Sequence, residues 1–200
     1  MPVNNYSPQE LTNLGIRFGD NIRVHRTVEF FGGNVTLGSH VRIDCHCVIS
    51  SKEPVLIGNH VHFGVGVHIF GAAGVVIEDY CGLSSRCSIF TTSDDYSEGY
   101  LTNPTIPDRY KKVLTQPVKL EKHAIVGCGS VIMPGVTICS GASVGALTFV
   151  NKRVPEFAIV GGSPLRKIGI RNRERLHMLE KQYEEEERNH TKDSGNHRRG

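Results

Sequence analysis

The chain has 200 residues and a net charge of +3, a length that fits one domain with a sizeable core. Charged residues make up 22% of it and hydrophobic residues 38%, which is ordinary for a soluble protein, and so weak a basic excess gives no reason to expect nucleic acid as a partner. No apolar run reaches the roughly 18 residues of a membrane span, and the first residues lack a signal-peptide pattern. The six cysteines form no C-x-x-C motif, so we expect reduced thiols in a cytoplasmic protein.

Residues 1–17 predict a short capping helix and a lead-in to the main domain. Ser7, Pro8 and Glu10 have the spacing of a capping box with proline at the first helical position. A solenoid needs such a cap because its first coil otherwise exposes the core.

Between residues 18 and 168 an aliphatic or aromatic residue returns at every sixth position, in groups of three that are separated in places by longer steps. A helix of period 3.6 cannot keep this spacing, so short strands are the better prediction. Extra residues fall only after every third member, which indicates three flat faces and one corner that tolerates insertions. We therefore predict an all-β solenoid, a triangular prism of about six coils. The repeating positions are Phe18, Val24 and Phe30, then Leu37, Ile43 and Ile49, then Ile57, Phe63 and Ile69, then Ile77, Leu83 and Ile89, and finally the unbroken series Leu120, Val126, Ile132, Ile138, Val144 and Val150.

One corner carries a long insertion. Residues 90–117 separate Ile89 from the equivalent position Val118, at the corner where the shorter insertions also fall. Long loops in compact domains are usually functional, so we expect the chemistry here. A loose flap or a clasp between subunits is the alternative.

The last part of the chain has helix-forming composition. Residues 169–188 include the apolar Leu176, Leu179 and Tyr183 and predict a helix packed outside the prism. Residues 189–200 are polar and are expected to be disordered.

The segments LEKHAIVGCGSVIMPGVTICSGASVGALTFV and VGGSPLRKI resemble the left-handed β-helix hexapeptide-repeat acyltransferases. Within that family the chain is most similar to nucleotide-amino-sugar N-acetyltransferases and to galactoside O-acetyltransferase, over about residues 6–175. The resemblance implies a left-handed parallel β-helix, acetyl-CoA as co-substrate, direct attack on the thioester, and a homotrimer with active sites at the subunit interfaces. The left hand comes from the resemblance alone, since the usual crossover rule favours the opposite one.

The loop departs from the sugar O-acetyltransferases at the position of their general base. Those enzymes open this loop with a pattern like T-x-x-H-P; here Asp94 takes the place of the histidine, and residues 90–117 contain none. A sugar hydroxyl needs a base in the transition state, whereas a neutral amine is already a nucleophile whose ammonium form a carboxylate can orient and deprotonate. We predict N-acetylation with Asp94 as a catalytic group, and O-acetylation of a sugar or other hydroxyl acceptor is the alternative.

Two further groups are candidates for catalysis. His123 begins the coil after the loop and is expected close to the loop's return. Cys128, in V-G-C-G, matches the family position whose backbone N–H faces the thioester, where it would stabilise the oxyanion. An acyl-cysteine intermediate is the alternative role for Cys128.

The predicted acceptor is a nucleotide-linked amino-dideoxy sugar carrying dTDP, UDP or GDP, used in O-antigen, capsule or glycan biosynthesis. Arg86 is the best match for its diphosphate because a guanidinium fits phosphate geometry. Surface or packing roles are the alternatives for all candidate acceptor-binding residues, which are His62, Ser84, Arg86, Asp95 and Tyr96.

For acetyl-CoA the resemblance implies a pantetheine arm along the prism and coenzyme phosphates near its C-terminal end. Gly169 stands where the galactoside enzyme has a second basic residue, so Lys167 or Arg171 would replace that contact. The cofactor-binding residues implied are Gly127, Cys128, Ala146, Asn151, Lys152 and Arg166.

Two other classes of protein compete with the acyltransferase. Ten histidines raise the question of zinc, as in γ-class carbonic anhydrases, which share the prism. However, no H-x-x-x-x-H pair occurs. Successive side chains of a strand point to opposite faces, which separates neighbours such as Cys45 and His46, so no metal is predicted. The second competing class is a non-enzymatic binding module. The long insertion and the basic ending argue against it, because a plain scaffold needs neither.

Overall fold

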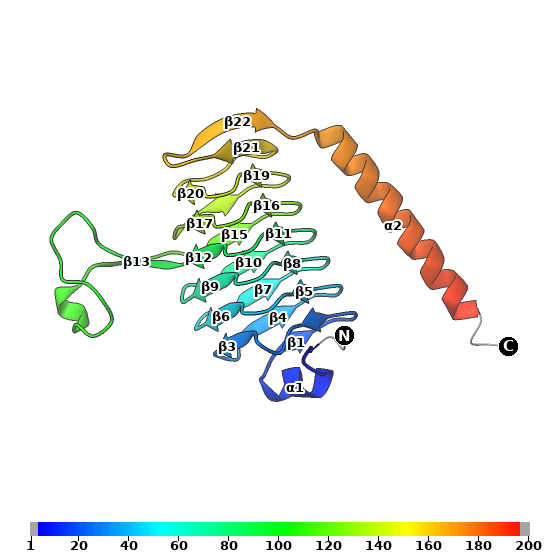
Figure 1. Cartoon of the computed structure of the whole chain (residues 1–200), viewed down its shortest axis with the longest axis horizontal. Helices are drawn as coiled ribbons and strands as arrows, with labels where there is room; N and C mark the ends of the chain where they lie inside the picture. Colours follow the sequence, from blue (N-terminus) through cyan, green and yellow to red (C-terminus); the bar gives the residue numbers. More distant parts are fainter. Residues whose placement is uncertain (1–3, 197–200) are drawn as a thin grey trace.

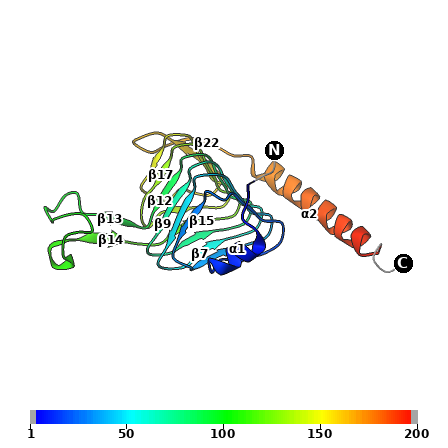
Figure 2. The same cartoon turned by 60° about the horizontal axis from the view of Figure 1, so that its bottom comes forward.

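The computed structural model describes residues 4–196 as a three-sided prism from which a loop and a helix project (Figure 1). Helix α1 (Pro8–Asn13) lies at the N-terminal end of the prism, and helix α2 (Arg173–Asn196) lies outside its walls. Turned by 60°, the walls are seen to surround one interior, with the loop and α2 on opposite sides (Figure 2).

Three sheets form the walls, and each coil gives one short strand to each sheet. The first sheet contains β1 (Arg17–Phe18), β4 (Val35–Leu37), β7 (Val55–Ile57), β10 (Val75–Ile77), β15 (Val118–Leu120) and β18 (Thr137–Ile138). The second contains β2 (Arg23–Val24), β5 (Arg42–Ile43), β8 (His62–Phe63), β11 (Gly82–Leu83), β16 (Ile125–Val126), β19 (Ser143–Val144), β21 (Ala158–Gly161) and β22 (Arg166–Ile170). The third contains β3 (Glu29–Phe31), β6 (Val48–Ser51), β9 (His68–Gly71), β12 (Ser88–Phe90), β17 (Val131–Ile132) and β20 (Phe149–Val150).

The three corners take their names from these sheets. The first corner joins the first sheet to the second, the second corner joins the second sheet to the third, and the third corner returns the chain to the first sheet of the next coil. The long loop leaves the third corner after β12 and contains β13 (Thr92–Asp94), the 3₁₀ turn Asp108–Tyr110 and β14 (Val113–Thr115). The predicted corner insertion is therefore confirmed.

The core is a stack of aliphatic side chains held in register by parallel pairing. Leu83, for example, pairs with Phe63 in the coil below and with Val126 in the coil above, and all three are at most 1% exposed. Such burial stabilises each coil only through its neighbours, as in other solenoids. The period of six is thus confirmed, and the predicted six coils correspond to six strands in the first and third sheets, with β21 adding a seventh parallel strand to the second.

The ends of the prism are closed differently. At the N-terminus the predicted capping box is present: the Glu10 amide donates to Ser7 Oγ, and Glu10 Oε2 accepts from the Ser7 amide at 2.8 Å. At the C-terminus β22 pairs antiparallel with β21 and covers its edge. The expected helix over 169–188 therefore begins later, at Arg173, because residues up to Ile170 complete the sheet.

Helix α2 also continues further than expected. It runs to Asn196, so residues 189–196, expected to be disordered, are helical; residues 197–200 lie outside the described part of the chain. Its many Glu, Lys and Arg residues are good helix formers, and Lys181 lies 4.0 Å from Glu185 one turn away. Neither helix in residues 4–196 combines the length and the apolar character needed to cross a membrane.

Glycine allows successive coils to approach closely at the corners. A Cβ atom added to Gly38 would lie only 2.6 Å from the carbonyl oxygen of Gly58 in the next coil. At Gly82, on the outer side of β11, an added Cβ would meet nothing within 4 Å. Backbone atoms cannot move aside as a flexible side chain can, so the first position requires glycine and the second does not.

We expect Gly38→Ala to destabilise the protein by about 1–3 kcal/mol, because the methyl group overpacks against backbone. The matched variant Gly82→Ala should stay within about 0.5 kcal/mol of the parent. Thermal unfolding followed by circular dichroism measures both. Equal melting temperatures for the two variants would contradict the close approach of the coils.

Candidate active site

The loop starts and ends in a small antiparallel ribbon that carries Asp94. β13 and β14 pair from Thr92 with Thr115 to Asp94 with Val113, and the ribbon projects away from the prism (Figure 1). An ion pair between Lys112 and Glu98 ties the two arms of the loop together beyond the ribbon. The loop is thus an ordered arm and not a slack connection.

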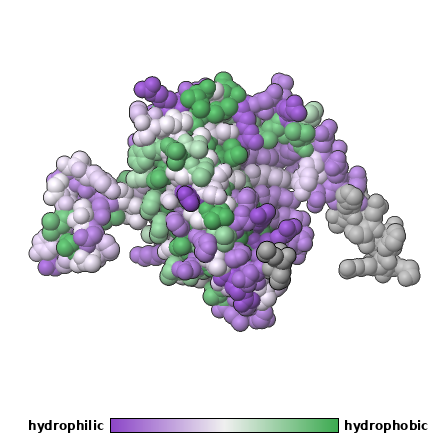
Figure 3. Space-filling model, in the orientation of Figure 1, coloured by the Kyte–Doolittle hydropathy of each residue, from purple (hydrophilic) through white to green (hydrophobic). Residues whose placement is uncertain are grey.

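Asp94 lies at the base of this arm, where it borders a hollow. The backbone N–H of Asn103 donates to Asp94 Oδ2 at 3.1 Å, which fixes the carboxylate, and within residues 4–196 no hydrogen bond to its other oxygen is found. The hollow has a volume of about 630 Å³ and lies between the loop and the outer side of the third sheet, where Phe90, Met133 and Phe149 line it. Green hydrophobic residues gather on the prism next to the base of the loop (Figure 3).

The two residues after Asp94 differ in character. Asp95 accepts hydrogen bonds from the Glu98 amide and from Ser97 Oγ, which closes a local turn. Desolvation alone would raise the pKa of Asp95, but these hydrogen bonds lower it overall. Tyr96 is 92% exposed and also borders the hollow beside Asp94.

The second corner collects most of the other predicted site residues in one column, a coil apart from each other. Ser84 is half-buried, and the exposed side chain of Arg86 extends over Gly66 in the preceding coil. In the next coil Cys128 carries an exposed free thiol. No acceptor among the described residues bonds the Cys128 amide, so this N–H is available to a ligand.

Gly127 brings the backbone of this column together. A Cβ atom there would lie 2.4 Å from the backbone nitrogen of Ala146 in the following coil. Arg166, at the start of β22, pairs with Gly161 and therefore lies at the same edge of the second sheet. Asn151 and Lys152, by contrast, follow β20 and stand exposed at the third corner, so the predicted cofactor residues divide between two corners.

Arg171, a candidate for a coenzyme phosphate, is engaged elsewhere. Its Nη1 donates to the carbonyl oxygen of His123 at 2.8 Å and is 3.4 Å from that of Gly141. Burial lowers the pKa of this guanidinium. Arg171 therefore closes the C-terminal end of the first corner and does not face the column of Cys128.

His123 lies at the first corner, away from the loop, contrary to the expected position near the loop's return. It is 8% exposed, its ring stacks on Tyr80 with centroids 5.0 Å apart, and its Nε2 lies 3.0 Å from Glu180 Oε2 of α2. The strand β15 separates the end of the loop from this corner. We therefore assign His123 to the attachment of α2 and not to proton transfer.

The ring of His123 belongs to a stack that sequence reasoning missed. His40, His60, Tyr80 and His123 stack in successive coils with centroid distances of 4.5–5.0 Å, and Tyr183 of α2 packs edge-on against His60. Each member follows a buried residue of the first sheet by three positions and has positive φ. That common position is the sequence signal that would have revealed the stack.

His62 projects outward from the second sheet and is half-exposed. Its Nε2 lies 2.9 Å from Asp44 Oδ2, while Arg42 Nε lies 2.7 Å from the other carboxylate oxygen. Partial burial alone would raise the pKa of Asp44, but the hydrogen bonds from His62 and Arg42 lower it overall. His62 lies at some distance from Asp94, because the whole third sheet separates the second corner from the loop.

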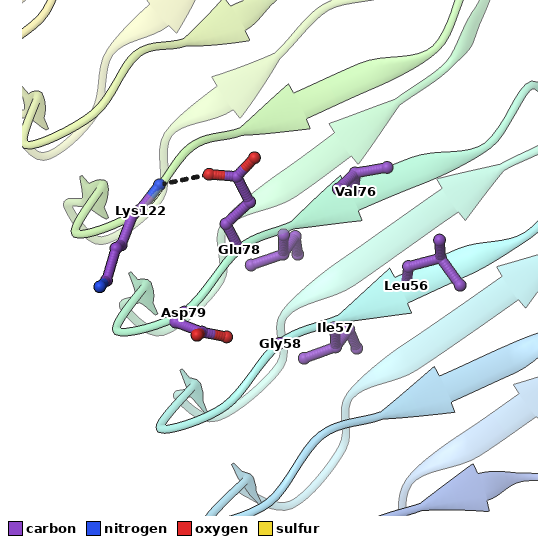
Figure 4. Close-up of a pocket in the computed structure, with 8 residues that line it drawn as sticks. Leu56, Ile57, Gly58, Val76, Glu78, Asp79 and Lys122 are labelled. Atoms are coloured by element: carbon purple, nitrogen blue, oxygen red, sulfur yellow. Dashed lines mark hydrogen bonds between the residues drawn. The ribbon is translucent and has the colours of Figure 1, made fainter.

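A further hollow of about 330 Å³ lies on the first sheet (Figure 4). Leu56 and Val76 line one side of it; on the other, the backbone N–H of Lys122 donates to Glu78. It contains none of the predicted site residues. No group of three or more potential metal-ligating side chains is found within the described residues.

Within one chain, then, most of the predicted catalytic and acceptor-binding groups fall into two parts, and His123 at the first corner lies outside both. Asp94, Asp95 and Tyr96 stand beyond the third sheet at the third corner, and Ser84 and Cys128 stand before it at the second corner. The outer side of the third sheet lies between these parts. A parallel β-prism with a corner arm and a column of exposed corner amides is the architecture of hexapeptide-repeat transferases.

Comparison with known proteins agrees with this class. No family model matches the chain. The dTDP-4-amino-4,6-dideoxy-D-glucose acyltransferase of Escherichia coli is 34% identical over 172 residues, which cover 84% of this chain and 90% of the relative. The chain belongs to the hexapeptide-repeat acyltransferase family, and it is an acyltransferase.

Solved structures of AntD, an N-acyltransferase from Bacillus cereus, have the same fold. A variant in complex with dTDP-4-amino-4,6-dideoxyglucose and coenzyme A is 32% identical, with a TM-score of 0.87 over 92% of this chain and 100% of AntD. AntD with dTDP and 3-hydroxybutyryl-CoA is also 32% identical, with a TM-score of 0.85 over 92% of this chain and 98% of AntD. Other AntD structures carry S84A or D94N substitutions in that enzyme's own numbering.

The attachment of α2 gives a stability prediction. We expect Glu180→Gln to lower the free energy of unfolding by about 1–2 kcal/mol, because Glu180 is 12% exposed and contacts both Lys122 and His123. Burial alone would raise the pKa of Glu180, but Lys122 and His123 lower it overall. Its contribution is therefore present above the ordinary carboxyl pKa of 4.5 and is lost as the pH falls through the lowered value.

Urea unfolding at several pH values measures this effect. The difference between parent and Glu180→Gln should be full at pH 7 and should shrink on acidification. Glu185→Gln, which removes an exposed contact with Lys181 on the same helix, is the matched control and should change stability by less than about 0.5 kcal/mol. A pH-independent difference would contradict the assignment.

Proposed function

We propose that the protein transfers an acetyl group from acetyl-CoA to the amine of a nucleotide-linked amino-dideoxy sugar. The observation that carries this proposal is the aspartate at the base of the loop, Asp94, in a chain 34% identical to an acyltransferase of dTDP-4-amino-4,6-dideoxy-D-glucose. AntD, which is bound to that sugar nucleotide and coenzyme A, supports the same class of acceptor and favours dTDP over UDP or GDP. The product would serve O-antigen, capsule or glycan synthesis.

The reaction needs a neutral amine, a polarised carbonyl and a leaving thiolate. The amine nitrogen attacks the thioester carbon, a C–N bond forms, and the C–S bond then breaks. The proton that nitrogen loses passes to Asp94, directly or through water, and then to the coenzyme thiolate. The amide N–H of Cys128, which has no described partner, would donate to the carbonyl oxygen as negative charge develops there.

Ser84 stands one coil before Cys128 in the same column, where it would contact the sugar or the thioester. AntD has been studied with substitutions at a serine and an aspartate, and this chain has the same residue types at the same numbers. Asp95 and Tyr96 would contact the acceptor from the loop. Asp95 would act through its local turn, which holds the backbone around Asp94.

The site is complete only if two chains meet. Asp94 stands at one corner and Cys128 at another, with a full sheet between them, so we propose that the arm of one subunit reaches the column of its neighbour in a homotrimer. The projection of the arm away from its own prism supports this arrangement (Figure 1). Each trimer would then have three sites at its interfaces.

The coenzyme would lie along the second corner. The pantetheine arm would pass Gly127, Cys128 and Ala146, and Arg166 at the same edge would hold a coenzyme phosphate. Asn151 and Lys152 stand at the third corner and would contact the coenzyme from an adjacent subunit. The free state of all six cysteines supports a reducing compartment, the cytoplasm.

The reaction class is tested with a thiol-release assay. We expect turnover with acetyl-CoA and dTDP-4-amino-4,6-dideoxyglucose, and none with the matching 4-hydroxy sugar nucleotide, because the loop contains no histidine to deprotonate a hydroxyl. Butyryl- and 3-hydroxybutyryl-CoA establish the preferred acyl length. Turnover with hydroxyl acceptors alone would establish the alternative, an O-acetyltransferase.

The role of Asp94 is tested by Asp94→Asn. Asparagine keeps the hydrogen bond from Asn103 but removes the charge, so kcat should fall by about 10²–10⁴-fold with little change in the KM for acetyl-CoA. Asp108→Asn, which removes a fully exposed carboxylate elsewhere in the same loop, serves as the control and should retain most of the activity. Unchanged turnover of Asp94→Asn from pH 6 to 9 would show that Asp94 neither orients nor deprotonates the amine.

A further inference from the structure

A hollow of about 440 Å³ lies on the second sheet beside the second corner, at the N-terminal end of the prism. It stands apart from the loop, which leaves the third corner, and from α2, which covers the first. Two arginines, a histidine and one carboxylate supply its charged and titratable groups, and the full lining is Asn5, Arg23, His25, Arg42, Ile43, Asp44, Cys45 and Val65. None of these belongs to the groups assigned so far to acceptor or coenzyme.

Two arginines stand side by side at the centre of this hollow. Arg23 of β2 and Arg42 of β5 are paired in register on adjacent parallel strands, about 4.8 Å apart, and both are exposed on the outer side of the sheet. Within the described residues no side chain bonds the guanidinium of Arg23, and only the Nε of Arg42 is engaged. Like charges so close repel each other unless an anion lies between them.

The neighbouring groups hold these donors in place. Asp44 binds Arg42 through Nε, which leaves the outer edge of that guanidinium free, and offsets only one of the two positive charges. The backbone N–H of Thr27 donates to Nδ1 of His25 at 3.2 Å, so this nitrogen is an acceptor and the ring proton stands on Nε2. His25 therefore presents a further donor. Guanidinium groups match the paired oxygens of phosphate groups.

We propose that this hollow binds the diphosphate of the nucleotide-linked acceptor, an inference that rests on the proposed function and deepens it. Asp44 and Ser84 occupy equivalent places at the second corner two coils apart, about 10 Å at about 4.8 Å per coil. A hexose ring together with the diphosphate attached to its glycosidic oxygen spans a distance of that scale. A sugar whose amine lies at Ser84 therefore places its diphosphate beside Arg42 and Arg23.

Arg86 extends the same positive strip. Its side chain passes over Gly66, in the coil between Ser84 and the hollow, and so leads from the sugar towards the N-terminal coils. The coenzyme also carries a diphosphate, but its expected partner Arg166 stands at the opposite end of the prism. The two diphosphates therefore bind at opposite ends of one column, and the reacting groups meet between them.

The test measures acceptor and coenzyme binding separately in the intact protein. Arg23→Gln and Arg42→Gln should each weaken dTDP binding, followed by titration calorimetry, by about tenfold, and the double variant by more. The KM for the amino-sugar nucleotide should rise in parallel, while kcat and the KM for acetyl-CoA stay within twofold. Binding of 3′,5′-ADP, which probes the coenzyme site, should not change.

Arg17→Gln is the matched control. Arg17 stands in the same coil as Arg23 but on the first sheet, where its Nε donates to Thr36 Oγ1, and its loss should leave dTDP binding unchanged. Melting temperatures identify any variant that is misfolded. For such a position the Arg→Lys variant is measured in place of Arg→Gln. Lysine keeps the positive charge but not the paired donors of the guanidinium, so we expect a smaller loss of dTDP affinity than in a folded Gln variant.

The outcomes separate this inference from the proposed function. Unchanged dTDP affinity in a folded Arg23→Gln/Arg42→Gln double variant overturns the inference, even if the parent acylates the amino sugar. Loss of 3′,5′-ADP binding in place of dTDP binding assigns the hollow to the coenzyme and also overturns it. Arginine-dependent dTDP binding without any acyl transfer would support the inference and refute the proposed function.

Discussion

The constraint on which this structure depends is the fixed spacing of its coils. Each coil is held to the next by parallel strand pairing, so equivalent residues repeat about every 4.8 Å along the prism. A corner is consequently a straight column of residues, one per coil. Ser84, Gly127 and Gly145 lie in line because the registers of β11, β16 and β19 agree, and Cys128 and Ala146 each follow by one residue. An extended substrate could lie along such a column.

The same spacing creates the ring stack at the first corner. Aromatic planes pack well at 4.5–5.0 Å, close to the coil repeat, so His60 and Tyr80 stack without distortion. Positive φ at these positions turns the rings outward, where α2 covers them through Tyr183 and Glu180. A histidine at this corner therefore supports the helix, and a histidine on the loop would have been needed for base catalysis.

Much of the fold was predictable from the sequence because one period governs it. Core positions such as Ile69 and Val126 follow from the spacing alone. The loop is visible in the sequence because the next repeating core residue after Ile89 comes only at Val118. The spacing after Leu120 also places His123 at the first corner, but its role was not predictable in this way. Its neighbours depend on α2, which is more than fifty residues further along the chain and whose packing leaves no periodic signal. Arg171 was misjudged for the same reason, since its carbonyl partners belong to distant coils.

The division of polar residues among the corners indicates how one narrow scaffold handles two large, anionic substrates. If both diphosphates bound at the same end, their charges would repel across a few ångströms. In the binding mode we propose, basic residues at opposite ends, Arg42 towards the N-terminus and Arg166 towards the C-terminus, would instead orient each substrate with its reactive end towards the middle. The middle of the column needs only small, weakly polar groups such as Ser84 and the Cys128 amide. In the arrangement we propose, the charged group of the reaction, Asp94, enters from the arm of a neighbouring subunit, so that the amine would meet its carboxylate only where two subunits come together.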